Sequence, residues 1–125
     1  MIKVIGCALI QNAEGKFLAE RLNKERVGGV IVPPGGKLED NESVRNCVIR
    51  EVKEELNIDI EITGLAAITE ENYGEKDGDW IFIWYGARII SGTPTIMEPG
   101  KILELKWIDK TEFKNAQDIK WLDKL

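Results

Sequence analysis

The stretch that decides the fold is GGKLEDNESVRNCVIREVKEELNI, residues 35–58. It opens on a glycine pair that two prolines precede, and such a sequence ends a strand and builds a shaped loop. Ser43 to Leu56 then has the apolar spacing of a helix, and Asp40-Asn41 offers residue types that cap a helix start. Asn57 follows the helix and tolerates the left-handed conformation common just past a helix end. The stretch therefore predicts a loop followed by one helix.

Three carboxylates in the second half of this helix continue the side that is apolar in its first half. At about 100° per residue, Glu54 and Glu55 fall within roughly 60° of Glu51, in line with Cys47 and Val48. A solvated acidic face is the alternative interpretation. However, acids three and four residues apart repel, and near a helix C-terminus they meet the unfavourable end of the dipole. A bound cation would compensate, and oxygen-only ligands favour Mg²⁺ or Mn²⁺ over zinc.

Residues beside these acids offer further contacts. Gly35 and Gly36 allow the backbone to approach a ligand, and a peptide carbonyl there is a candidate oxygen ligand, with a plain tight turn as the alternative. Arg50 can orient a carboxylate through a forked hydrogen bond. Its position on the solvent side of the helix leaves a surface role open.

Composition excludes several kinds of chemistry. The 125 residues include 17 Lys and Arg, 22 Asp and Glu, and no histidine, so a Ser-His-Asp or Cys-His nucleophile and a His-ligated zinc are excluded. The net charge of −5 argues against a polymeric nucleic acid or an anionic membrane as partner. No apolar segment is long enough to cross a bilayer. Cys7 and Cys47 lie in apolar runs, which predicts buried, reduced thiols and a cytoplasmic location.

The rest of the chain supplies strands on both sides of the helix. Glu70–Asp79 and Ser91–Gly100 are expected loops, and no linker or repeat divides the single domain predicted for residues 1–125. The resulting order, β-β-β-α-β-β-β-α, predicts an α+β fold with helices packed against a mixed sheet. The strands are expected at Ile2–Ile10, Lys16–Leu22, Val27–Val32, Ile58–Thr69, Trp80–Ile90 and Ile102–Ile108, and one or two short helices at Thr111–Leu125, with Trp121 and Leu122 facing the body.

The spacing from Gly36 to Ile58 resembles the signature of the Nudix hydrolase family, G-x5-E-x7-R-E-U-x-E-E-x-G-U, in which U is aliphatic. Every fixed position matches except one, where Asn57 stands in place of a glycine. The signature covers 23 of the 125 residues. The predicted order of elements also agrees with the α/β/α sandwich of this family, which has a mixed β-sheet between helices.

The resemblance implies an enzyme that hydrolyses a nucleoside diphosphate linked to another group, with water attacking a phosphorus atom. It implies a Mg²⁺-dependent pyrophosphohydrolase, with Mn²⁺ as a second candidate cofactor, acting on a nucleoside triphosphate or a related derivative. The implied catalytic residues are Glu51, Arg50 and Glu54, and which acid is the base varies within the family. The implied metal ligands are the Gly35 carbonyl, Glu51, Glu54 and Glu55. Glu42 is implied as an outer partner, although on an ideal helix it lies opposite Glu51.

Outside the signature, the same resemblance suggests residues that bind substrate, namely Arg21, Gly36, Lys37 and Tyr73. Glu98 and Glu104 are weaker candidates for an additional acid, and either is as readily an exposed surface charge. Hydrolysis of ADP-ribose or a dinucleoside polyphosphate is an alternative activity, and a non-catalytic nucleotide-sensing module is an alternative of another class. The expected partner is a small nucleotide, and the expected state is a monomer or homodimer.

Overall fold

Two β-sheets carry the fold of the computed structural model, which describes residues 2–23 and 31–117. The first sheet has the order β4 (Gly35–Lys37), β1 (Ile2–Ile10), β6 (Asp79–Ser91) and β5 (Asp59–Asn72). It is mixed, because β1 and β6 run parallel while the other pairs are antiparallel. The second sheet is antiparallel, and its order is β3 (Ile31–Val32), β2 (Phe17–Leu22) and β7 (Ile102–Ile108).

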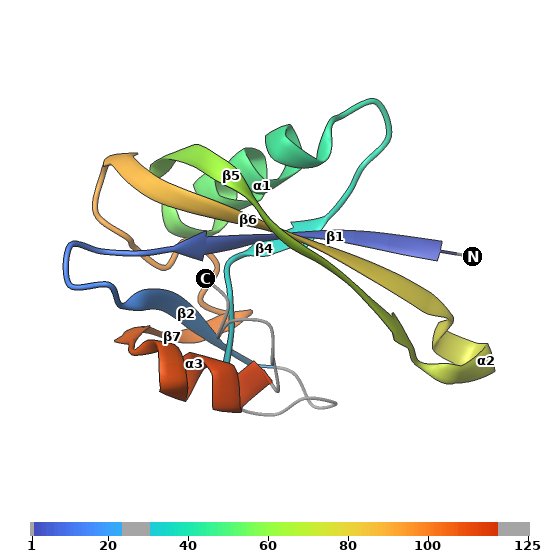
Figure 1. The fold of residues 1–125 in the computed structure, drawn as a ribbon. Coiled ribbons are helices and arrows are strands. Elements are labelled where there is room, and N and C mark those ends of the chain that lie inside the picture. Colours follow the sequence, from blue (N-terminus) through green and yellow to red (C-terminus); the bar gives the residue numbers. More distant parts are fainter. Residues whose placement is uncertain (1, 24–30, 118–125) are drawn as a thin grey trace.

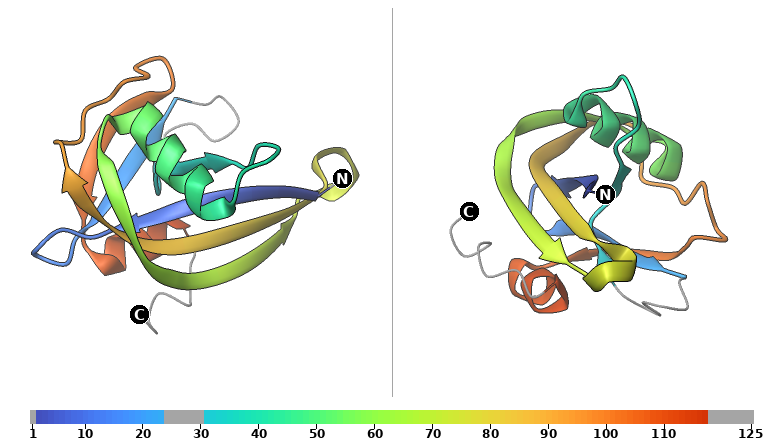
Figure 2. Two further views of the ribbon diagram at one scale, coloured as in Figure 1. Left: turned by 90° about the horizontal axis from the view of Figure 1, so that it is seen from above. Right: turned by 90° about the vertical axis from the view of Figure 1, so that its right-hand side faces the viewer.

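Helices lie on opposite sides of these sheets. Helix α1 (Val44–Leu56) contacts β1, β4 and β5, whereas α3 (Lys110–Gln117) contacts β2 and β3 on the other side (Figure 1). The short helix α2 (Gly74–Asp77) closes the long hairpin of β5 and β6 (Figure 2). The predicted α+β architecture, a mixed sheet with helices on both sides, is confirmed. In the part of the chain described, no helix has the length and apolar character needed to span a membrane.

Two clusters of side chains form the core, one on each face of β1. Ala8 and Ile10 point toward α1, where they join Val48, Val52 and Leu56. The alternate residues of β1 point the other way, as strand geometry requires, and pack with α3; this second cluster contains Cys7, Leu9, Phe17, Ala19, Trp84, Ile108 and Phe113. Both cysteines are free and buried, as predicted.

The ends of α1 follow from local chemistry. The Ser43 hydroxyl accepts a hydrogen bond from the Asn46 amide at 3.1 Å, so Ser43 is the N-cap. The expected cap at Asp40-Asn41 is wrong, because Asn41 is in a turn with φ of 63°. At the other end Asn57 has φ of 55°, and its amide donates to the Lys53 carbonyl at 3.0 Å. Asparagine therefore terminates this helix as a glycine would, which confirms the prediction for Asn57.

The structure differs from expectation in two further places. Residues Gly35–Lys37 were expected in a loop, but they pair with β1. Gly35 has φ of 154°, and a Cβ there would collide with the Gly6 carbonyl, so only glycine permits this approach. The expected loop Glu70–Asp79 is shorter, because its ends extend β5 and β6 with solvent-facing polar side chains. Trp121, Leu122 and the first part of the expected strand Val27–Val32 lie outside the described residues.

Candidate active site

Arg50 is the centre of a group of carboxylates at the start and middle of α1. Its Nη2 and Nε donate to the two oxygens of Glu42 at 2.8 and 3.0 Å, which makes a forked pair. Its Nη1 donates to Glu51 Oε1 at 3.0 Å and to Glu54 Oε2 at 3.2 Å. Arg50 thus orients the acids of the signature, and the loop before α1 brings Glu42 to it despite its position on an ideal helix.

These contacts set the protonation of the acids. The hydrogen bond from Arg50, then that from the Glu39 amide, lowers the pKa of Glu42 to about 2. Burial raises the pKa of Glu51, and the guanidinium of Arg50 opposes this rise. The hydrogen bond with Glu42 in turn raises the pKa of Arg50, so both members of the pair are charged at neutral pH.

A loss of stability in acid is expected from the Glu42 pair. Because the folded protein holds the ionised form more strongly than the unfolded chain does, this stabilisation is complete above the ordinary pKa of 4.5 and disappears as the pH falls toward about 2. Thermal melts of the wild type and Glu42→Gln should therefore differ most at neutral pH, with the difference in Tm closing between these two values. A difference that stays constant across the range would contradict the assignment.

Glu55 lies deeper and has different partners. Its side chain is fully buried, and Lys101 Nζ donates to its Oε2 at 2.6 Å, while the Gly35 amide approaches its Oε1 at 3.4 Å. Burial raises the pKa of Glu55, against the opposing effect of Lys101. Burial lowers the pKa of Lys101, but the hydrogen bond and charge of Glu55 outweigh it, and the net direction is upward. The two groups therefore form an ion pair at the C-terminal half of α1, in which Glu55 is buried and Lys101 is partly exposed.

The loop between β6 and β7 delivers Lys101 to this position. The Thr95 amide donates to the Leu56 carbonyl and the Met97 amide to the Glu55 carbonyl, both at 2.9 Å. These bonds satisfy carbonyls that would be unpaired at the end of a helix. Glu98, on the same loop, interacts electrostatically with Lys101. The structure thus places Glu98 near Lys101, the partner of Glu55.

Glu20 is a further acid of this region that sequence reasoning missed. It is 2 % exposed, and its Oε2 has no hydrogen-bond partner among the described residues. Burial, then the charge of Glu55, raises the pKa of Glu20 to about 9. The strand pattern indicated that Glu20 is buried, because Leu18, Glu20 and Leu22 are alternate residues of the strand and therefore share one face. Lys101, also missed, had no comparable signal.

The repulsion among the acids is offset within the protein itself. The sequence suggested that a bound cation was needed, but Arg50 and Lys101 supply compensating charge. Glu54, exposed to solvent, bonds to Arg50 rather than continuing the buried side. As the side chains of the described residues lie, no three acids or cysteines converge closely enough to hold a metal ion together.

The residues nevertheless fit a hard divalent cation. The donors are all oxygen atoms, which suits Mg²⁺ or Mn²⁺. Gly36 leaves room that a side chain would fill, because a Cβ there would overlap the carboxyl group of Glu51. The carboxylates of this region still outnumber its two positively charged side chains, Arg50 and Lys101.

The other predicted residues are distributed over the molecule. Lys37 follows Gly36 and is exposed on β4. Arg21 points to the face of β2 opposite Glu20, where its Nε donates to Glu104 at 3.3 Å. Lys106 also approaches Glu104, at 3.7 Å. The structure therefore does not bring Arg21 and Glu104 to the helix acids.

Tyr73 stands at the end of the β5–β6 hairpin, where it begins a row of aromatic rings. Its ring meets Trp80 edge-on at 5.6 Å between centroids, and Trp80, Phe82 and Trp84 continue along one face of β6 at spacings of 6.2 and 6.3 Å. Since α2 lies far from α1 in both views, Tyr73 is not beside the helix acids (Figure 2).

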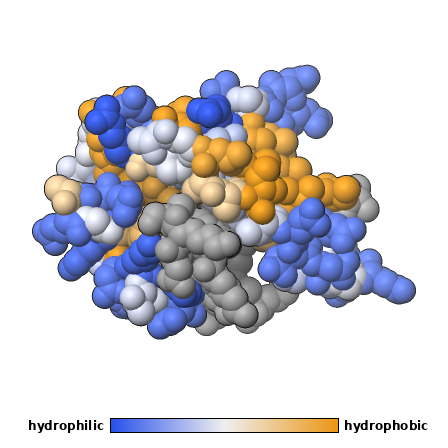
Figure 3. Space-filling model, viewed as in Figure 1, coloured by the Kyte–Doolittle hydropathy of each residue, from blue (hydrophilic) through white to orange (hydrophobic). Residues whose placement is uncertain are grey.

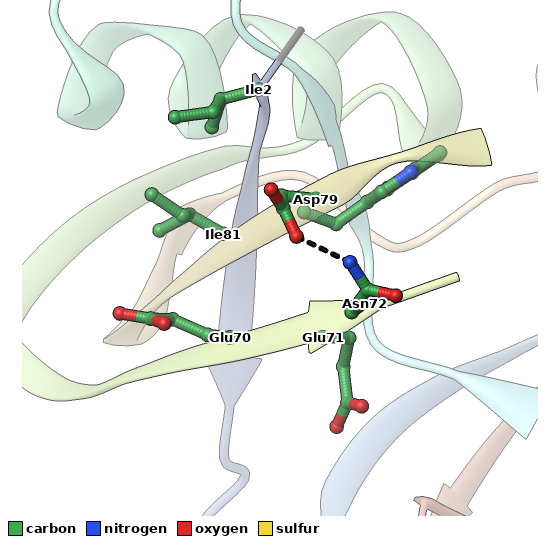
Figure 4. A pocket seen from close by; sticks show the side chains of 7 residues that line it. Ile2, Glu70, Glu71, Asn72, Asp79 and Ile81 are labelled. Atoms are coloured by element: carbon green, nitrogen blue, oxygen red, sulfur yellow. Dashed lines mark hydrogen bonds between the residues drawn. The ribbon is translucent and has the colours of Figure 1, made fainter. Parts of the chain in front are cut away.

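The same end of this hairpin carries a hollow of about 410 Å³, and Trp80 is among the residues that line it. Figure 4 shows Asp79 and Asn72 joined across it by a hydrogen bond of 2.6 Å, with Glu70, Ile81 and Ile2 around them. Apolar side chains gather along β1 and the strands beside it, as Figure 3 shows, and the exposed ones include Ile2, Leu65 and Ile68. None of the predicted site residues lines this hollow.

The fold and the helix acids that an arginine orients together define the class of the protein. A model of the NUDIX domain matches residues 2–125, and the chain therefore belongs to the Nudix family. The prediction of the family is confirmed.

Similar proteins agree with this assignment. The uncharacterized Nudix hydrolase YvcI of Bacillus subtilis (strain 168) is 37% identical over 124 residues, which cover 90% of this chain and 69% of that protein. An 8-oxo-dGTP diphosphatase of Proteus vulgaris is 48% identical over 44 residues, 35% of this chain and 39% of that protein. The match therefore spans well under half the length of the Proteus relative. The crystal structure of a MutT NUDIX hydrolase from Burkholderia pseudomallei superposes with a TM-score of 0.83 at 25% identity, covering 94% of this chain and 97% of that one.

Proposed function

We propose that this protein is a Mg²⁺-dependent pyrophosphohydrolase that cleaves the pyrophosphate of a nucleoside triphosphate or a related nucleoside diphosphate derivative. The observation that supports it best is the group formed by Glu51, Glu54 and Glu55 on one helix, with Arg50 orienting two of them. The name of the Proteus relative, a diphosphatase of a nucleoside triphosphate, supports the choice of substrate class.

Each residue of the group has a proposed role. Glu51, Glu54, Glu55 and the Gly35 carbonyl would hold Mg²⁺ or Mn²⁺. Such a cation neutralises negative charge on the pyrophosphate oxygens and makes water more acidic. Arg50 fixes the Glu51 carboxylate by its 3.0 Å hydrogen bond, so that Glu51 can accept the proton of the attacking water. Glu54, also bonded to Arg50, is the second candidate for the base.

On the substrate side, Gly36 adjoins Glu51, and Lys37 follows it on β4 with an exposed side chain, so we propose that its ammonium contacts the phosphates. Tyr73, the exposed ring at the start of the aromatic row, offers an accessible face, and we propose that the nucleobase stacks on it. The proposed location is the cytoplasm, where Cys7 and Cys47 would remain thiols. A small nucleotide is the proposed partner of a monomer or homodimer.

A nucleotide panel tests the proposed function. Nucleoside triphosphates, ADP-ribose and dinucleoside polyphosphates are incubated with the protein and Mg²⁺ or Mn²⁺, and the products are separated by ion-exchange chromatography. We expect a nucleoside triphosphate to yield the monophosphate and pyrophosphate, with no product when EDTA replaces the cation. Release of two nucleotide products from ADP-ribose or a dinucleoside polyphosphate, with triphosphates untouched, would favour the alternative activity. Nucleotide binding without cation and without turnover of any substrate would refute the enzyme and favour a sensing module.

A further inference from the structure

Glu20 is a buried acid that the roles proposed above do not use. Only 2 % of the residue is exposed, and its Oε2 lacks a hydrogen-bond partner within the described part of the chain. A buried polar atom left without a partner is costly, and a buried carboxylate more so. Such an atom calls for a function in the folded protein.

The fold aims this side chain at the Glu55–Lys101 pair. Leu18 and Leu22, on the same face of β2 as Glu20, pack in the cluster that contains Leu56 and Ile102. Glu55 precedes Leu56 and Lys101 precedes Ile102 in the chain, and the Asn23 amide donates to the Lys101 carbonyl at 2.8 Å. Glu20 accordingly interacts electrostatically with both members of the pair.

Lys101 is the member of this group that can most readily change partner. Its ammonium has three donors on a flexible stem, its side chain is 38% exposed, and one donor is used by Glu55 at 2.6 Å. A divalent cation held by Glu55 would compete for the same carboxylate and repel the ammonium. Lys101 would then need another acceptor. Glu98 also lies near it, but Glu98 is partly exposed and water can already solvate its carboxylate.

We propose that Glu20 is a positioning residue that receives the Lys101 ammonium when a divalent cation occupies Glu55. In this arrangement Lys101 is the internal counter-ion of Glu55 in the cation-free protein. The free Oε2 of Glu20 keeps the displaced ammonium bonded and at a distance from the cation. Cation affinity therefore depends on Glu20 only through Lys101. The inference rests on the proposed function, because it requires the cation site at Glu55.

A double-mutant cycle on Mn²⁺ binding tests this dependence. Free Mn²⁺ is measured by electron paramagnetic resonance during titration of the full chain as wild type, Glu20→Gln, Lys101→Met and the double variant, without substrate. Glu20→Gln preserves shape but replaces the carboxyl group with an amide that cannot form an ion pair with the ammonium, and we expect it to weaken Mn²⁺ binding about tenfold, the size expected for a group that supports a ligand. In the Lys101→Met background the same change should alter the Kd less than about twofold, because no ammonium remains to be received. Glu61→Gln, on the exposed edge strand and paired with Arg88, is the matched control and should leave the Kd unchanged.

The outcomes separate the inference from the proposed function. An equal loss of affinity from Glu20→Gln with and without Lys101 would identify Glu20 as a direct ligand and overturn the positioning role. No loss in either background would overturn it as well. Both results leave the cation site intact, whereas absence of Mn²⁺ binding by the wild type would refute the site itself and the inference with it. Circular dichroism melts in EDTA confirm that each variant is folded.

Discussion

Glu55→Gln should lower kcat on the order of 100- to 1000-fold while the protein stays folded, as removal of one electrostatic contact to the reacting group does in other enzymes. Glu55 is fully buried, and it bonds both the Gly35 amide and Lys101. Glutamine keeps this volume and an acceptor oxygen, but it lacks the charge that a divalent cation requires. Steady-state hydrolysis of the best substrate in the panel, with saturating Mg²⁺, measures the effect.

Glu54→Gln extends the test to the exposed acid of the same helix. Because its side chain is largely in solvent, the substitution should leave Tm unchanged while it lowers kcat by a similar factor. Glu61→Gln again serves as the control, since it removes an exposed acid on β5 that bonds Arg88 on β6. If Glu54→Gln and Glu55→Gln both retain near-full activity, the metal-ligand assignment is wrong.

Arg50→Lys should lower both activity and stability, although the charge is conserved. Lysine cannot make the forked pair with Glu42 and at the same time reach Glu51, because its ammonium is a single point of donation. We expect kcat to fall about 100-fold, within the range typical of general-base assistance. We also expect Tm to fall by several degrees, since Glu42 and Glu51 lose their shared partner.

A matched control for Arg50 is Arg88→Lys, in which the arginine is exposed and bonds Glu61 alone among the contacts described. This variant should retain the activity and Tm of the wild type, because exposed ion pairs contribute little to stability. Equal behaviour of Arg50→Lys and Arg88→Lys would show that Arg50 is only a surface charge, the alternative that its place on the helix leaves open.

Much of the fold was predictable, because the patterns that specify it are local. The helix Val44–Leu56 and the strand Ile102–Ile108 follow apolar periodicity closely, and Asn57 ends the helix as its side chain permits. The strand at Gly35–Lys37 was not predictable, since its pairing with β1 depends on contacts between distant residues. The length of the β5–β6 hairpin was also underestimated, because acidic residues such as Glu70 and Glu71 are typical of a loop unless a partner strand is known.

The candidate site was predictable only in its helical part. The spacing of Glu51, Glu54 and Glu55 placed them on one helix, but it did not show which is buried and which is exposed. Nothing local to Lys101 reveals that the loop is bonded to the end of α1. The roles of Glu20 and Arg50 also depend on tertiary contacts. Glu20 reaches the site because β2 packs near α1, and Arg50 is bonded to Glu42 because of the course of the loop that carries Glu42.

The bonds from Thr95 and Met97 to the last carbonyls of α1 join two segments into one unit of local stability. Native proteins open in contiguous cooperative units, and these two segments share the hydrogen bonds that would have to break. Opening of the loop therefore leaves the carbonyls of Glu55 and Leu56 without their partners and removes a support of the helix turn that bears Glu55. A ligand that orders the loop would therefore also restrict the motion of Glu55. Local opening of the loop and local opening of the helix turn are expected to be coupled.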